Sequence, residues 1–77
     1  MMGSMNWRER IESDPQILHG KPCIKGTRLR VALVLGYLAA GRDAAAICQE
    51  FPDLSTTDVA ASLEYARELA EFEAVPA

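Results

Sequence analysis

The sequence contains very few of the residues from which metal sites are built. Its 77 residues include one histidine, His19, and two cysteines, Cys23 and Cys48, which form no CxxC pair. A structural zinc site needs about four clustered Cys or His ligands, so we expect neither a metal nor another cofactor. We expect both cysteines to be reduced thiols, mostly buried among apolar neighbours.

Patterns that support catalysis are equally scarce. Serine, histidine and acidic residues show no arrangement that would activate a nucleophile, and no pair of carboxylates lies in an apolar run. A phosphate-binding Walker loop would need the pattern G-x-x-x-x-G-K-[ST], whereas Gly26 is followed by Thr27 and Arg28. The sequence therefore predicts a protein that is not an enzyme.

Long hydrophobic runs are also absent. Apolar residues make up 49% of the chain, which is too many for a disordered protein, but no run approaches the ~20 residues of a membrane span. The stretch VALVLGYLAA, residues 31–40, is too short for a span and predicts a buried helix. The start MMGSMNW lacks the regions of a secretory signal. We therefore expect a soluble cytoplasmic protein with no membrane partner.

Acidic residues are scarce in the first half of the chain and abundant in the second. The whole chain has a net charge of −3, but residues 1–42 hold seven basic and three acidic residues, and residues 43–77 hold one basic and eight acidic residues. The stretch HGKPCIKGTRLRV, residues 19–31, has four cations and no acid. This separation of charge suggests charged partners or head-to-tail contacts.

Turn residues and an alternating pattern indicate an N-terminal arm. We expect Gly20 and Gly26 to adopt positive φ in turns. The run from Thr27 to Val31 alternates apolar and basic side chains, which predicts a short half-buried strand. Residues 7–31 are therefore expected to form a small β-hairpin arm.

Two short helices are predicted after the arm. Apolar residues surround residues 31–40 nearly completely, so we expect this helix at the centre of the domain, ending before Gly41. Asp43 is a suitable N-cap for the second helix, which Pro52 ends. The predicted buried face of the second helix follows the i, i+3, i+4, i+7 spacing and consists of Ala44, Ile47, Cys48 and Phe51.

A third helix begins with a specific signal. Ser55 and Asp58 fit a capping box, and Leu54 and Val59 have the spacing of a hydrophobic staple. The predicted buried stripe of this helix consists of Val59, Leu63, Ala66, Leu69, Ala70 and Phe72. The residues predicted to face water are Glu64, Arg67, Glu68 and Glu71. Arg67 and Glu71 have the i, i+4 spacing of an ion pair.

These elements predict a mainly α fold, a trihelical homeodomain-like helix-turn-helix with an N-terminal β-hairpin. A short junction over residues 51–54 joins the second and third helices, as in a helix-turn-helix. We expect one domain over residues 7–74, divided into the arm (7–31) and the three-helix unit (31–74). Residues 1–6 are expected to be a flexible start or a remnant of cloning, and residues 75–77 a short tail. The core is small, so a second subunit would stabilise it.

DNA binding is one function that such a fold suggests. The candidate contacts to DNA are Lys21, Lys25, Arg28, Arg30, Arg42, Thr56 and Thr57. The cations would contact phosphates, and the threonines open the helix that would enter the major groove. However, that helix start has no Arg, Lys, Asn or Gln, and Asp58 and Glu64 would repel phosphates. The sequence thus supports the shape better than DNA recognition, and a protein-interaction module is the main alternative.

Several short motifs resemble one known family. In order, they are Asp14-Pro15, GKPCIKGTR at residues 20–28, LAAG at residues 38–41, FPDLS at residues 51–55 and Tyr65-Ala66. Over residues 11–66 the chain resembles the bacterial family catalogued as domain of unknown function 433. The resemblance implies a homeodomain-like helix-turn-helix with an N-terminal hairpin, often dimeric. Members of this family are described as antitoxin-like and encoded beside a small PIN-like nuclease, and no catalytic site is established for them.

The resemblance therefore implies the neutralising half of a toxin–antitoxin pair, which binds a PIN-like nuclease, and its own promoter DNA is a second expected ligand. We expect a homodimer, in which two hairpin arms pair with each other, are exchanged, or straddle a DNA duplex. The acidic third helix is the candidate surface for a basic nuclease, through Glu64, Glu68 and Glu71. The alternative is a dimeric interaction module or a plain transcriptional regulator without a toxin partner.

Overall fold

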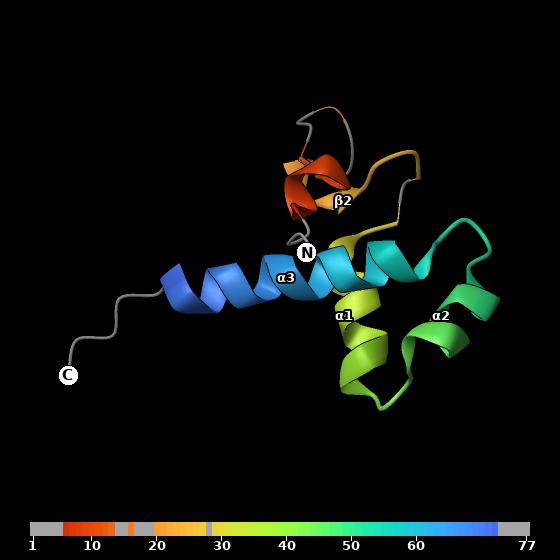
Figure 1. The fold of residues 1–77 in the computed structure, drawn as a ribbon. Helices are drawn as coiled ribbons and strands as arrows, with labels where there is room; N and C mark the ends of the chain where they lie inside the picture. The colour runs from red at the N-terminus through yellow and green to blue at the C-terminus, as the bar shows by residue number, and fades with distance from the viewer. Residues whose placement is uncertain (1–5, 14–15, 17–19, 28, 73–77) are drawn as a thin grey trace.

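Three α-helices and a two-stranded antiparallel hairpin make up the computed structural model, which describes residues 6–13, 16, 20–27 and 29–72 (Figure 1). In chain order the elements are the 3₁₀ helix η1 (Trp7–Glu9), the strands β1 (Ile11–Glu12) and β2 (Cys23–Ile24), and the helices α1 (Val31–Ala39), α2 (Ala44–Glu50) and α3 (Thr56–Phe72). This order confirms the predicted mainly α fold with an N-terminal hairpin.

The second strand of the hairpin lies earlier in the chain than the sequence predicted. Strand β2 ends at Ile24, so the strand predicted over residues 27–31 is wrong. The chain turns there because Gly26 has a φ of +82° and the Thr27 hydroxyl donates a hydrogen bond to the Ile24 carbonyl at 3.0 Å. Val31, which was predicted both as the end of that strand and as the first residue of a helix, begins α1.

Helix α1 is buried on one face only. Val31 and Val34 are each 1% exposed, and Gly41, with a φ of +98°, lies just beyond the helix as predicted. The apolar residues exposed on its outer face are Ala32, Leu33, Gly36, Ala39 and Ala40. The prediction that α1 is covered on all sides is therefore wrong. Few elements are available in so small a domain, and α2, α3 and β2 cover only the inner face.

Helix α2 follows the sequence prediction closely. The Asp43 carboxylate accepts a hydrogen bond from the backbone N–H of Ala46 at 2.9 Å, which confirms the N-cap. Ile47 is fully buried. The other residues of the predicted face are partly buried against the core, and these are Ala44, Cys48 and Phe51. The four residues therefore form the inner face of α2.

Helix α3 begins at the predicted capping box. The Asp58 N–H donates to the Ser55 hydroxyl at 3.2 Å, and the Ser55 N–H donates to the Asp58 carboxylate at 3.0 Å. The two residues of the predicted staple are buried, with Leu54 5% exposed and Val59 2% exposed. This start is thus fixed by local hydrogen bonds and by packing.

The second half of α3 leaves the body of the domain. Figure 1 shows the C-terminal turns of α3 extending past α1 and the hairpin. Leu63 and Leu69 are 49% and 55% exposed, and Ala70 is exposed as well, so the prediction that these three are buried is wrong, whereas Ala66 is partly buried. The side chain of Phe72 lies outside the described part of the structure. Of the other elements, η1 contacts this half of α3, through Tyr65 and Glu68, and leaves Leu63 and Leu69 exposed.

The hairpin and the helices share one core. Its buried members are Ile11, Ile24, Val31, Val34, Ile47, Leu54, Val59 and Ala61. Each fully buried aliphatic side chain of this size contributes about 1.5–3 kcal/mol. The two isoleucines of the hairpin are among the most buried residues, so the arm packs on its own chain as part of the core. In the described residues no helix is long and apolar enough to cross a membrane.

Candidate functional site

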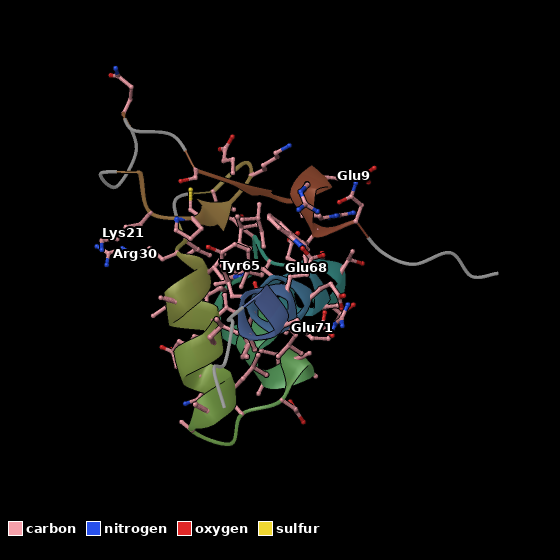
Figure 2. All side chains as sticks on the ribbon, turned by 90° about the vertical axis from the view of Figure 1, so that its left-hand side faces the viewer. Glu9, Lys21, Arg30, Tyr65, Glu68 and Glu71 are labelled. Carbon is pink, nitrogen blue, oxygen red and sulfur yellow. The ribbon has the colours of Figure 1, made fainter. Side chains whose placement is uncertain are left out.

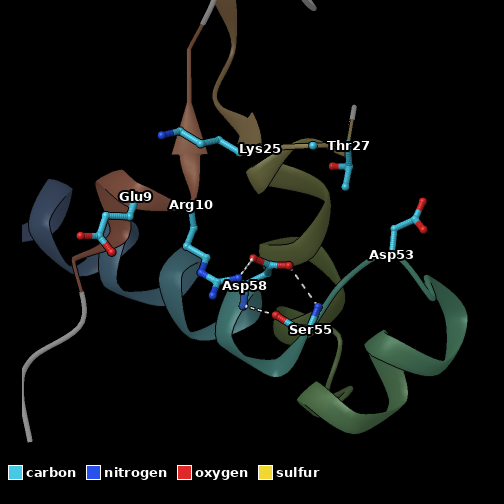
Figure 3. A pocket seen from close by; sticks show the side chains of 8 residues that line it. Glu9, Arg10, Lys25, Thr27, Asp53, Ser55 and Asp58 are labelled. Atoms are coloured by element: carbon cyan, nitrogen blue, oxygen red, sulfur yellow. Dashed lines mark hydrogen bonds and ion pairs between the residues drawn. The ribbon is translucent and has the colours of Figure 1, made fainter.

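A polar cleft of about 640 Å³ lies between the hairpin and the start of α3 (Figure 3). Asp58 lines it, although this residue is only 7% exposed. One carboxylate oxygen of Asp58 accepts from Arg10 Nη1 at 3.2 Å, and the other accepts from the Ser55 N–H at 3.0 Å. Both oxygens are therefore occupied, and Asp58 acts as a latch that ties the hairpin to α3.

The charges around this cleft are mixed. Arg10 and Lys25 face three acids, which are Glu9, Asp53 and Asp58. A phosphate site would need an excess of cations or backbone donors, and this cleft has an excess of acids. Its chemistry is therefore that of a polar junction between two parts of the fold.

Of the basic residues proposed as DNA contacts, Lys21 and Arg30 form a cluster at one end of α1, and the others described lie elsewhere. Arg30 pairs with Cys23 in an isolated antiparallel bridge, which brings Arg30 close to Lys21, and Figure 2 shows these two cations on the same side of the molecule. Arg42 lies beyond the opposite end of α1, and Lys25 lines the polar cleft. Arg28 lies outside the described residues.

The other candidate contacts to DNA do not extend this cluster. Arg42 is paired with Glu50 at 2.9 Å and lies over the ring of Tyr37, 5.3 Å from its centroid. Thr56 and Thr57 are exposed in the first turn of α3. The structure therefore brings Lys21 and Arg30 together and leaves Arg42 neutralised at the far end of α1.

Each of the three glutamates proposed as partner contacts is paired with an arginine. Arg67 Nε donates to Glu64 at 2.9 Å, and Arg67 Nη1 donates to Glu71 at 2.7 Å. Arg8, from η1, pairs with Glu68 at 3.5 Å. The hydrogen bond from Arg67 lowers the pKa of the Glu64 carboxyl, and the same bond raises the pKa of the Arg67 guanidinium.

These pairs hold the glutamates in place, and the surface keeps a net negative charge. We define the glutamate face as Glu9, Glu64, Glu68 and Glu71 with Arg8 and Arg67, which together have a net charge of −2. Figure 2 shows Glu9, Glu68 and Glu71 on the side of the molecule opposite Lys21 and Arg30. The separation of charge along the sequence therefore becomes a separation of charge across the fold.

Aromatic contacts fix η1 to α3 beside the glutamate face. The rings of Trp7 and Tyr65 meet edge to face with centroids 4.9 Å apart, and the Arg8 guanidinium lies 4.5 Å from the centroid of the Trp7 ring. A guanidinium over an aromatic ring is attracted to its face. Arg8 is thus positioned by Trp7 as well as by Glu68.

Sequence reasoning missed the exposed apolar surfaces. An open apolar groove of about 350 Å³ runs along α1 and is lined by Ala32, Leu33, Gly36, Tyr37 and Ala40. The projecting half of α3 exposes Leu63 and Leu69. The signal was present in the sequence, because a helix that is apolar all round cannot be covered on every side by two other helices and a hairpin.

Residues 11–66 match the model of a family described as a protein of unknown function (DUF433). The match runs from β1 into the middle of α3 and covers Lys21, Arg30, the whole of α1 and the residues of the polar cleft other than Glu9 and Arg10. No curated protein and no solved structure matches the chain.

Proposed function

The chain belongs to the DUF433 family, and we propose that it serves in the cytoplasm as the antitoxin-like, non-enzymatic partner of a small PIN-like nuclease. The glutamate face of α3 is the proposed contact. The resemblance described above suggests the class of partner, and the geometry of this face is the observation that carries the proposal.

Charge and order both support the glutamate face as a binding surface. A nuclease that binds nucleic acid presents cations to phosphates, and a surface with a net charge of −2 complements such cations. Arg67 holds Glu64 and Glu71 in place at 2.9 and 2.7 Å. Side chains that are ordered before binding lose less conformational entropy on association.

Charge reversal tests this proposal. The triple variant Glu64→Lys/Glu68→Lys/Glu71→Lys should weaken binding to the PIN-like nuclease of the same source at least about tenfold, about 1.4 kcal/mol. Affinity is measured by calorimetry, and neutralisation is measured as inhibition of RNA cleavage. Circular dichroism shows whether the variant keeps its helices.

Glu50→Lys is the matched control. Glu50 lies on α2, outside the glutamate face, and its side chain is 45% exposed and paired with Arg42 at 2.9 Å. This variant should bind the nuclease like the parent protein. Unchanged affinity of the triple variant, or an equal loss in Glu50→Lys, would contradict the proposal.

DNA binding is the second candidate, and the unpaired cations favour it. Lys21, Lys25 and Arg30 are exposed and have no ion-pair partner within the described residues. If they contact phosphates of the promoter, changing all three to Ala should lower the slope of log affinity against log salt by about 2–3. Arg42→Ala is the control, because Glu50 already pairs with Arg42. An unchanged slope in the triple variant would exclude this contact.

A further inference from the structure

A small pocket lies between η1 and α3, at the edge of the glutamate face. Its volume is about 200 Å³, and its lining is mostly apolar. The residues that line it are Trp7, Arg8, Tyr65, Glu68 and Leu69. Figure 2, which looks along α3, shows Tyr65 and Glu68 on the side of this helix that faces η1. Arg8 and Glu68 belong both to the pocket and to the glutamate face, so the two surfaces are continuous.

The pocket has aromatic and aliphatic walls and one exposed ion pair. The rings of Trp7 and Tyr65 meet edge to face with centroids 4.9 Å apart, so each holds the other in place. Leu69 lines the same pocket and is 55% exposed. Arg8 is paired with Glu68 at 3.5 Å, so the two charges in the pocket cancel. Because the pocket has no net charge and mostly apolar walls, it favours an apolar side chain.

The surroundings of the pocket are acidic. Apart from the ion pair that it shares with the pocket, the glutamate face holds three glutamates and one arginine, a net charge of −2. Arg67 holds two of these glutamates, Glu64 and Glu71, in place. The neighbours of a side chain in the pocket would therefore be favoured as cations. An apolar centre within a charged surface is the usual anatomy of a protein interface, in which a few buried anchors contribute most of the binding energy.

We propose that this pocket is the anchor point of the glutamate face and receives one large apolar side chain, aromatic or branched aliphatic, that a basic partner presents between cations. The volume is below the roughly 300–1,000 Å³ of pockets for drug-sized ligands, which suits a single side chain. The inference rests on the proposed function, because it names what the same face recognises in its basic partner. It adds shape to a contact that was so far argued from charge.

Two short peptides test the chemistry of the occupant without any nuclease. The probes are acetyl-KRFRK-amide and acetyl-KRSRK-amide, which carry the same charge and differ only in the central residue. The chain is labelled with 5-fluorotryptophan, and Trp7 is its only tryptophan, so a single fluorine NMR signal reports on the pocket. The Phe peptide should bind at least about tenfold more tightly than the Ser peptide, because it buries an apolar side chain. It should also shift the signal of Trp7.

Salt separates the anchor from the charges around it. Raising the salt concentration from about 0.05 M to about 0.5 M should weaken the binding of both peptides, because exposed charges are screened. The ratio of the two dissociation constants should stay near about tenfold, since the apolar contact is not screened. Equal dissociation constants for the two peptides, or a Trp7 signal that the Phe peptide does not shift, would overturn the proposal.

Leu69→Gln and Leu63→Gln are a matched pair of variants. Both leucines are exposed on α3, at 55% and 49%, and of the two it is Leu69 that lines the pocket. Leu69→Gln should lower the preference for the Phe peptide at least about threefold, whereas Leu63→Gln should keep it. Circular dichroism shows whether both variants retain their helices. An equal effect of the two substitutions would contradict an anchor in this pocket.

Binding to the PIN-like nuclease of the same source distinguishes this inference from the proposed function. Leu69→Gln keeps every residue of the glutamate face and should still weaken binding at least about tenfold. A nuclease that depends on the three glutamates but binds Leu69→Gln like the parent would overturn the anchor alone. A nuclease that does not bind the parent protein would contradict the proposed function, and the two peptides would still decide whether the pocket takes an apolar side chain.

Discussion

Replacing Asp58 with alanine should destabilise the domain more than the loss of an ordinary helix cap. The Asp58 side chain is 9% exposed and accepts hydrogen bonds from the Ser55 N–H at 3.0 Å and from Arg10 at 3.2 Å. The first bond caps α3, and the second connects α3 to a residue 48 positions earlier in the chain. The variant removes both bonds at once.

The expected cost follows from these two contacts. Loss of a carboxylate cap costs about 1 kcal/mol. The Arg10 side chain is 45% exposed, so solvent screens its pair with Asp58, which we value at about 0.5–1 kcal/mol. Ser55 and Arg10 are exposed, so water satisfies the donors that the variant leaves and no further penalty is added. The total is about 1.5–2 kcal/mol, out of roughly 4–11 kcal/mol for a domain of this size.

Urea unfolding followed by circular dichroism, at one low protein concentration, measures this cost as a change in the midpoint at constant m-value. Asp43→Ala is the control, since Asp43 caps α2 at 2.9 Å but is exposed and has no partner across the fold among the described residues. It should cost about 1 kcal/mol. Arg10→Ala should cost about 0.5–1 kcal/mol. If Asp58→Ala costs no more than Asp43→Ala, the latch between hairpin and α3 has no energetic value and the reasoning fails.

Three further predictions concern packing, backbone and charge. Ile47→Ala removes a fully buried side chain and should lower the free energy of unfolding by about 2–5 kcal/mol, a result that a loss below 1 kcal/mol would contradict. Gly26→Ala should cost about 1 kcal/mol because the φ of Gly26 is +82°, although a Cβ there meets nothing within 4 Å; in the helical Gly36→Ala control the sign should reverse. Arg67 lowers the pKa of Glu64, so the stabilisation from their pair is complete above the ordinary carboxyl pKa and is lost as the pH falls through the lowered value. An NMR titration should show the pKa of Glu64 rising toward its ordinary value in Arg67→Gln, and an unchanged pKa would show that the pair is absent in solution.

Local chemistry made much of the fold predictable. The N-cap at Asp43, the capping box of Ser55 and Asp58, and the positive φ of Gly26 each involve residues no more than three positions apart. Such features depend on a few backbone atoms, so the sequence alone identifies them. The starts of α2 and α3 were predicted for this reason, whereas α1 has no side-chain cap and was predicted from its apolar run.

The long-range features could not be predicted in this way. The pair of Arg8 with Glu68 joins residues 60 positions apart, and that of Arg10 with Asp58 joins residues 48 positions apart. Nothing in the local pattern indicates either pair. The sequence predicted the local pair of Arg67 with Glu71, which the structure confirms at 2.7 Å, but it did not predict the pair of Arg8 with Glu68.

Burial was also harder to predict than secondary structure. The apolar stripe of α3 correctly indicates a helix with one face suited to packing, but it does not indicate which chain supplies the packing partner. Val59 is 2% exposed among its neighbours in the domain, whereas Leu69 stays 55% exposed beside Trp7 and Arg8. The same pattern therefore gave a correct prediction for the first half of α3 and a wrong one for the second.

The division of α3 into an anchored half and a projecting half makes its helical order depend on association. Isolated short helices are marginal in water, and most helical stability in proteins comes from packing. The last turns of α3 lack that packing in a single chain, so their amides should exchange with solvent far faster than those near Ser62, which is fully buried. A partner that docks on these turns completes the helix as it binds. The rate of amide exchange in these turns should therefore be lower in the complex than in the free chain.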